Sequence, residues 1–317
     1  LTPSSMPFVH FCTDDREPET LLSEGHMDDV LRKAIEAGAP PEVAISAATI
    51  HTARAYGIPG LGALAPGYHA DFLVLSDLKR MKIEEVYVEG KLVAEANRVV
   101  TDLPETPPPP ASPIRVHLDR LSFRIPAQGG RARTIRVIPE QVLTEEIRVQ
   151  PKVAGGEVLA DPERDILKIA VIERHRGTRN VGLGLVCGFG LREGALASTV
   201  AHDSHHIVVV GTTDEDMKQA VAELVAMGGG QVVVRRGKIL AALPLPIAGL
   251  MSDRPLSEVY WLSQELKKAA KSLGTKLPDP FMTLSFLALP VIPALKITDL
   301  GLVDVRRFTI VPLWEGG

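Results

Sequence analysis

Cysteine and aromatic residues are scarce in this 317-residue sequence. Its two cysteines, Cys12 and Cys187, form no CxxC pair. Their scarcity excludes a disulfide framework and a zinc knuckle, and it predicts a reducing, cytoplasmic compartment. Aromatic residues make up only 4% of the chain, so we expect a core built mostly from aliphatic side chains.

Excess positive charge and long apolar runs are missing as well. Lys and Arg number 35 and Asp and Glu 39, which gives a net charge of −4. The electrostatic footprint of a nucleic-acid or membrane-surface partner is therefore absent. No apolar run reaches the roughly 18 residues of a membrane-spanning helix. We expect neither a nucleic-acid partner nor a membrane partner.

Three familiar catalytic patterns do not occur either. The HxE and PCxxC pair of small cytidine-type deaminases is absent, as are the HExxH motif of metalloproteases and the GxSxG nucleophile elbow. The chain does have 45% hydrophobic and 23% charged residues, the composition of an ordinary globular protein. Its length predicts two or three domains.

Residues 1–58 predict a strand followed by helices. The apolar run at 8–12 ends in polar residues, which predicts a buried strand that opens into a loop. Helical spacing follows at 28–38, and a second helix is expected from Pro41 to about Tyr56. A strand, a polar loop and helices in this order are typical of α/β proteins.

Residues 59–103 predict a small β unit. A strand is expected at 70–75 and a hairpin at 86–93, with its turn at Glu89-Gly90. Because two or three strands are not stable alone, this unit must pack onto something else.

A proline-rich linker and a mixed α/β region follow. Six prolines lie between residues 103 and 113, which predicts a stiff linker at 104–113. Beyond it, residues 114–317 predict one α/β region with a helix at 214–227, capped by Thr213 and closed by Gly228. A second helix is expected at 255–273. Strands are predicted at 114–124, 133–138, 145–149, 166–174, 196–200, 206–210, 231–235 and 302–311.

Acidic residues follow the first predicted strand. Asp14 and Asp15 come directly after the apolar run at 8–12. In α/β barrels, carboxylates at the carboxyl ends of strands bind metals and transfer protons. A solvent-exposed turn closed by an Asp side chain is the alternative. Spacing alone does not choose between them.

Two further segments are rich in side chains that can act on a ligand. Glu24 and His26 precede a predicted helix and could touch a substrate or a metal, or the segment could simply cap that helix. His202, Asp203 and His205 are close enough in sequence to bind a zinc, manganese or iron ion together. They could equally be bonded to loop carbonyls. The glycine-rich segment 174–184 lacks phosphate-loop spacing and predicts tight turns.

Several motifs, in this order, resemble the bacterial and archaeal adenine deaminases, a family of the metal-dependent amidohydrolase superfamily. The resemblance covers nearly the whole chain. The more general motifs are FCTDDR (11–16), EGH (24–26), GALAPGYHADFLVL (62–75) and VEGKLV (88–93). The more specific ones are RHRGT (174–178), GFGL (188–191), GALASTVAHDSH (194–205), LPLPIAGLMSD (243–253) and DPFMTLSF (279–286).

The resemblance implies a fold and an activity. The fold would be the C-terminal end of an amidohydrolase (β/α)8 barrel with a small β-sandwich unit, followed by a separate mixed α/β C-terminal domain. The activity would be the hydrolysis of adenine to hypoxanthine and ammonia in purine salvage. It implies a divalent metal, as a binuclear manganese or iron centre or as zinc, and we expect a homodimer or a larger homo-oligomer.

The resemblance also implies roles for individual residues. Asp14 falls where the superfamily has an Asp that ligates the metal and moves protons, and Asp15 could share this role. Glu24 and His26 would line the purine pocket. A lid that faces the barrel mouth, or a site for an additional metal, would be formed by His202, Asp203 and His205.

The chain departs from the family pattern in ways that affect these expectations. Only thirteen residues precede Asp14, and the superfamily's HxH motif is not among them. We therefore expect a C-terminal portion that is inactive on its own. Arg179 stands where the family has glycine, and His206 stands where it has Asn. Two alternatives stay open: a non-catalytic accessory, lid or dimerisation module, and an amidohydrolase of another cyclic amine or amide.

Overall fold

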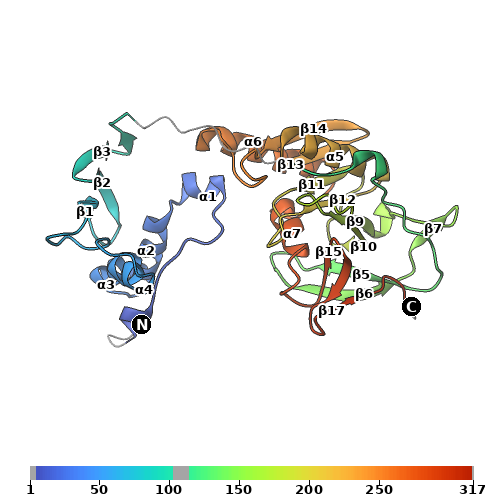
Figure 1. Cartoon of the computed structure of the whole chain (residues 1–317), viewed down its shortest axis with the longest axis horizontal. Coiled ribbons are helices and arrows are strands. Elements are labelled where there is room, and N and C mark those ends of the chain that lie inside the picture. The colour runs from blue at the N-terminus through green and yellow to red at the C-terminus, as the bar shows by residue number, and fades with distance from the viewer. Residues whose placement is uncertain (1–4, 103–113, 316–317) are drawn as a thin grey trace. The chain divides into compact units, whose positions relative to one another are not determined.

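The chain divides into two compact units, Leu1–Pro107 and Pro108–Gly317. The computed structural model drawn in Figure 1 describes residues 5–102 and 114–315. The proline-rich linker predicted at 104–113 lies outside the described residues. None of the helices in these two ranges is both long enough and apolar enough to cross a membrane.

Four short α-helices build the first half of unit 1. A 3-10 turn at Met6–Phe8 precedes them, and α2 packs against α3 through Leu31 and Ala44. The helices are α1 (Pro18–Ser23), α2 (Met27–Glu36), α3 (Pro41–Ala48) and α4 (Ile50–Ala55). The single helix predicted from Pro41 to Tyr56 is therefore broken. The break is at Thr49, where the backbone leaves the helical region.

The strand predicted at 8–12 is not formed. Phe8 ends the 3-10 turn Met6–Phe8, and in the described part of the chain the backbone of 8–12 donates two hydrogen bonds, from the Phe8 N–H to the Ser5 carbonyl at 3.1 Å and from the Phe11 N–H to the Ala47 carbonyl at 3.4 Å. A strand exists only through the ladder that a neighbouring strand provides. Residues 5–102 supply no such neighbour for this segment, so the barrel strand remains a prediction.

The second half of unit 1 is an antiparallel sheet in the order β1-β2-β3-β4. The predicted hairpin is confirmed: Glu89 and Gly90 both have positive φ, as a type I′ turn requires. Met81, between β1 and β2, lies in the same buried cluster as Leu31 of α2, so this sheet packs on the helices of its own unit. The strands are β1 (Phe72–Asp77), β2 (Lys82–Val88), β3 (Lys91–Glu95) and β4 (Arg98–Val99).

Unit 2 is built on an eight-stranded sheet in the order β14-β13-β11-β12-β9-β10-β5-β6. Every neighbouring pair is antiparallel except β10 and β5. The strands are β5 (Ala132–Val137), β6 (Thr144–Val149), β9 (Leu167–Ile172), β10 (Val181–Cys187), β11 (Ala195–Ser198), β12 (Ile207–Gly211), β13 (Gly230–Arg235) and β14 (Lys238–Pro244). A separate small hairpin joins β7 (Lys152–Ala154) to β8 (Glu157–Leu159).

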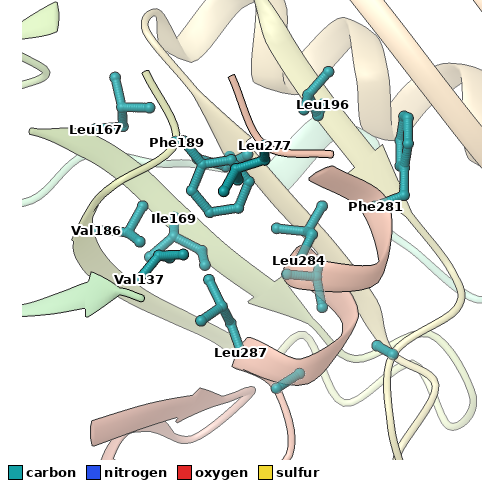
Figure 2. Packing of buried hydrophobic residues seen from close by; sticks show 14 of the residues in the cluster. Val137, Leu167, Ile169, Val186, Phe189, Leu196, Leu277, Phe281, Leu284 and Leu287 are labelled. Atoms are coloured by element: carbon teal, nitrogen blue, oxygen red, sulfur yellow. The ribbon is translucent and has the colours of Figure 1, made fainter. Parts of the chain in front are cut away.

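Helices cover both faces of this sheet. Strand β9 is buried along its whole length, and its side chains alternate between two clusters. Ile169 and Val171 lie in the larger cluster with α6 (Leu256–Ser272) and α7 (Pro280–Leu287). Ile172 lies in the other cluster, which includes Met217 of α5 (Asp214–Met227). Figure 2 shows the larger cluster, in which Leu284 and Leu287 of α7 face the sheet.

The caps predicted for α5 are confirmed. The Thr213 hydroxyl accepts a hydrogen bond from the Asp216 N–H, and Gly228 adopts the left-handed conformation at the C-terminal end. A threonine N-cap and a left-handed glycine together satisfy backbone groups that the helix leaves free at its two ends.

A three-stranded sheet, in the order β15-β16-β17, closes unit 2. Its strands are β15 (Leu295–Thr298), β16 (Gly301–Asp304) and β17 (Thr309–Val311). The long strand predicted at 302–311 is thus two strands joined by a turn. The strand predicted at 114–124 is wrong as well, since the only regular element there is a 3-10 turn at Leu118–Arg120.

Candidate functional site

Asp14 lies in an exposed turn of unit 1. Its φ is +51°, in the left-handed region that Asp tolerates better than most side chains. Within residues 5–102 and 114–315, its carboxylate makes no hydrogen bond and no ion pair. The carboxylate is therefore available to a ligand.

Arg16 anchors the Asp14 turn to α2. Its guanidinium donates to the Gly25 carbonyl at 3.0 Å and to the Asp29 carboxylate at 2.7 Å. Asp29 is buried in the first turn of α2, and hydrogen bonds from Lys33 and Arg16 lower its pKa from the ordinary value. A charged pair with one buried partner holds the turn firmly.

This anchor brings two of the predicted motifs together. Arg16 follows Asp14 by two residues, and Gly25 separates Glu24 from His26, so one hydrogen bond joins the two motifs. Both Glu24 and His26 are exposed. The Glu24 carboxylate pairs with the Lys33 ammonium at 2.9 Å, and His26 stands at the N-cap of α2 without capping it through its side chain.

Residues 173–176 and 202–206 form the second candidate region, in unit 2. They meet because Ile172 pairs with Ile207 across β9 and β12, which are antiparallel neighbours. The Arg174 Nε donates to the His205 carbonyl at 2.5 Å. The His175 Nε2 lies 2.8 Å from the Ser204 carbonyl, so it carries a proton there.

The structure does not gather His202, Asp203 and His205 around one point. The His202 ring packs on Phe286 at a centroid distance of 4.6 Å, and it lies 6.2 Å from the His205 ring. Asp203 is exposed. In the described ranges no three His, Cys, Asp or Glu side chains are placed to hold a metal ion. The prediction of a metal held by these three residues therefore has no support here.

Glu173 organises the glycine-rich turn, and sequence reasoning missed it. Its carboxylate accepts hydrogen bonds from the backbone N–H groups of His175, Arg176 and Thr178 at 2.5, 2.7 and 2.9 Å. Burial raises the pKa of Glu173, but these backbone donors outweigh burial and hold the pKa at about 2. The tight turn predicted at 174–184 is confirmed only around 173–178, where an internal carboxylate occupies the donors that a phosphate would need; residues 181–184 belong to β10.

His206 makes a separate contact at the edge of this region. Its Nε2 lies 3.7 Å from the Asp299 carboxylate, which also accepts a hydrogen bond from the Asn180 side chain at 2.9 Å. Burial lowers the pKa of both His206 and His205, so the neutral imidazole is favoured at each position.

Two families match this chain. Residues 141–309 match the family described as the adenine deaminase C-terminal domain, and residues 5–93 match the amidohydrolase family. The protein named adenine deaminase from Desulfatibacillum aliphaticivorans is 49% identical over 308 residues, which cover 97% of this chain and 54% of that protein. The protein of that name from Methanothrix thermoacetophila is 50% identical over 310 residues, again 97% of this chain and 54% of the relative.

This chain belongs to the adenine deaminase family. It spans about half the length of the relatives it matches. The resemblance found in the motifs is thereby confirmed. The amidohydrolase match contains the Asp14 turn, and the match to the adenine deaminase C-terminal domain contains Glu173 and the histidine segment.

The amidohydrolase match implies a divalent metal ion. The Asp14 carboxylate fits one ligand position, because it is exposed, anionic and unpaired within the described ranges. Since the described residues hold no group of three His, Cys, Asp or Glu side chains that could bind a metal ion, Asp14 is a candidate for one ligand only.

Proposed function

We propose that this chain is the C-terminal part of an enzyme that hydrolyses adenine to hypoxanthine and ammonia. What carries the proposal is the 49–50% identity to proteins named adenine deaminase over 97% of the chain. The geometry agrees with it, because Arg16, two residues after Asp14, donates a hydrogen bond to the Gly25 carbonyl between Glu24 and His26. The reaction replaces the amino group at C6 of adenine with the oxygen of water.

Asp14 would hold the divalent ion through a carboxylate oxygen. When bound, such an ion lowers the pKa of water towards neutrality and so supplies a nucleophile. Asp14 accepts the proton of the attacking water and passes it to the amino nitrogen that leaves C6 as ammonia. Asp15 orients the turn and can share the proton transfer. We propose a binuclear manganese or iron centre, with zinc as the alternative.

Glu24 and His26 would bind the purine. A carboxylate accepts hydrogen bonds and an imidazole can donate or accept them, so together they can recognise ring nitrogens and an amino group. Their exposure and their link to the Asp14 turn through Arg16 support this placement. His202, Asp203 and His205 would serve as a lid over the barrel mouth.

The domain organisation is part of the same proposal. Residues 1–58 would end the (β/α)8 barrel, residues 59–103 would form the flanking β unit, and residues 114–317 would be the adenine deaminase-type C-terminal domain. The enzyme would be cytoplasmic, would take part in purine salvage and would be a homodimer or a larger homo-oligomer. It would bind neither nucleic acid nor a membrane.

Substitution of Asp14 tests the catalytic assignment. In the full-length enzyme, Asp14→Asn is expected to lower kcat for ammonia release from adenine by about 10²- to 10⁴-fold, because the proton carrier is lost. Asp253→Asn, an exposed aspartate of unit 2, is the control and should leave kcat unchanged. If Asp14→Asn retains its activity and Asp15→Asn loses it, the proton-transfer role belongs to Asp15. Retained activity in both would refute it.

Two comparisons separate the alternatives. An accessory module predicts that Asp14→Asn leaves ammonia release by the full-length enzyme unchanged, whereas our proposal predicts its loss. This chain by itself is expected to release no ammonia in either case, because the described residues lack a complete metal-ligand set. An amidohydrolase of another substrate predicts faster turnover of guanine, cytosine or hydantoin than of adenine, and this outcome would contradict the substrate assignment.

A further inference from the structure

Arg174 is a buried cation that forms no ion pair with a described residue. The residue is 2% exposed. Its Nε donates to the His205 carbonyl and its Nη2 donates to the Ala248 carbonyl at 2.8 Å. In the described ranges Nη1 has no hydrogen-bond partner, and no carboxylate forms an ion pair with this guanidinium.

A buried guanidinium that contacts only neutral carbonyls is costly, because removal from water is not offset by an opposite charge. The charge of the adjacent Glu173 offsets only part of this cost, and its carboxylate accepts no hydrogen bond from Arg174 because it accepts from three backbone N–H groups and the Thr178 hydroxyl. Burial lowers the pKa of Arg174, and the Glu173 charge opposes this shift without cancelling it. An anion from outside would remove this cost.

Arg174 lines a cavity of about 340 Å³ in unit 2. None of the described residues that line it is acidic. They are Arg115, Arg174, His175, Ser204, His205, Ala248 and Leu250. The cavity is therefore basic and polar on one side, with an apolar wall formed by Ala248 and Leu250.

The lining offers further hydrogen-bond donors. The His205 Nδ1 accepts the Ala201 N–H at 3.4 Å, so the neutral ring carries its proton on Nε2. The Ser204 hydroxyl can donate as well. The Arg115 side chain is exposed and makes no hydrogen bond or ion pair with described residues.

The apolar wall is fixed in place, so the cavity is formed before any ligand binds. The buried Thr199 hydroxyl donates to the Gly249 carbonyl at 2.6 Å and accepts the Gly230 N–H at 2.7 Å. A Cβ at Gly249 would lie 2.9 Å from the Arg174 Nη1. Only glycine at 249 lets the loop pack against the guanidinium.

We propose that this cavity binds a small oxyanion, with a phosphate group as the preferred ligand. Arg174 can donate from Nη1, since Nε and Nη2 already donate to carbonyls, and Arg115 can present a planar fork that matches phosphate oxygens from the rim. The cavity volume exceeds that of a phosphate ion, which leaves room for a phosphomonoester whose apolar part rests on Leu250. The cavity is lined by residues of unit 2, and the proposal does not depend on the deamination reaction.

Titration of this chain with inorganic phosphate tests the proposal. Isothermal calorimetry at constant ionic strength, with chloride as the balancing anion, should show saturable binding of one phosphate per chain. Arg115→Gln should weaken this binding at least about fivefold, because one charge-assisted contact is lost. Arg306→Gln, an exposed arginine of another cavity, is the matched control and should bind phosphate as the unmodified chain does.

Further variants and ligands separate the outcomes. Arg174→Gln should abolish binding, and if that variant does not fold, Arg115→Gln alone decides. Tighter binding of adenosine monophosphate than of phosphate would identify a phosphomonoester site, and equal binding would identify a free-phosphate site; both support the proposal. The absence of saturable phosphate binding, an unchanged affinity in Arg115→Gln, or binding of acetate but not phosphate would overturn it.

Discussion

The single carboxylate of Glu173 holds the backbone of its turn in shape. It is 6% exposed, yet it stays ionised because three backbone N–H groups and the Thr178 hydroxyl point at it. The turn places Arg174 and His175 at the cavity of about 340 Å³. Glu173 is thus a structural anion that shapes a site without lining that cavity.

Removal of this charge should destabilise unit 2. Glu173→Gln is expected to lower the free energy of unfolding by about 3 kcal/mol at pH 7, because the folded pKa of about 2 lies well below the usual value of 4.5. The contribution is complete above pH 4.5 and is lost as the pH falls through 2. Urea unfolding at pH 7 and at pH 3 should show a smaller difference between variant and unmodified chain at pH 3.

An exposed glutamate provides the control for this measurement. Glu163→Gln, in the short 3-10 turn Pro162–Arg164, should change the unfolding free energy by less than about 0.5 kcal/mol at either pH. A pH-independent loss in Glu173→Gln would instead indicate a packing defect and would contradict the electrostatic explanation.

For single residues, the sequence predicts which side chains are candidates for a site better than it predicts their burial and contacts in the folded chain. The resemblance singled out Asp14, Glu24 and His26, and the structure joins their segments through Arg16. It could not reveal the unpaired charge of Arg174, because the carbonyls that contact it belong to residues 31 and 74 positions away. Whether a charged side chain is buried without an ion-pair partner can be seen only in the folded structure.

Among the elements, α5 illustrates local signals that agree with the fold. Thr213 caps its first turn, three acidic residues follow in that turn, and Gly228 ends the helix. Each signal suits the helix end at which it occurs, because acidic side chains stabilise the positive end of the helix dipole. The helix was therefore predictable to within a residue at both ends.

Loss of the cap tests this agreement. Thr213→Ala should lower the free energy of unfolding by about 1 kcal/mol, because the Asp216 N–H loses its acceptor. Thr213→Ser keeps a hydroxyl acceptor and should recover most of that stability. Equal losses in the two variants, measured by thermal or urea unfolding, would show that the hydroxyl is not what stabilises the helix end.

Strand β10 illustrates the opposite case. Gly182 and Gly184 led to a prediction of turns at 174–184, yet both lie within a strand. A Cβ at Gly182 would lie 1.8 Å from the Thr298 carbonyl oxygen, so the glycine permits the β15–β16 turn to cross the strand. Periodicity cannot distinguish a glycine needed for such an approach from one needed for a turn.

At the scale of the whole molecule, the described residues of unit 2 form a closed hydrophobic core, whereas one strand predicted for unit 1 has no neighbour among the described residues. Unit 2 buries both faces of its large sheet within residues 114–315, in two clusters that involve all three of its described α-helices. The α/β character of this region was predictable from alternating strands and helices. The strand predicted at 8–12 is not formed, because the described residues provide no neighbouring strand for it.

Unit 2 should therefore fold without unit 1. A chain of residues 114–317 is expected to give a cooperative thermal transition and dispersed amide resonances, since a domain of about 200 residues can form its own core. The 317-residue chain measured beside it is the reference. Non-cooperative melting with strong binding of a hydrophobic dye, in the shorter chain only, would show that unit 1 is required.

The contacts between β6 and the final sheet have a consequence for synthesis. Thr144 donates from its hydroxyl to the Leu295 carbonyl at 2.8 Å, across 151 positions of sequence. At roughly 5 to 20 residues per second, a ribosome needs about 8 to 30 s to travel between these two points. During that interval β6 has left the exit tunnel before its partner has been made. The nascent chain must keep this sheet edge soluble until the last strands emerge.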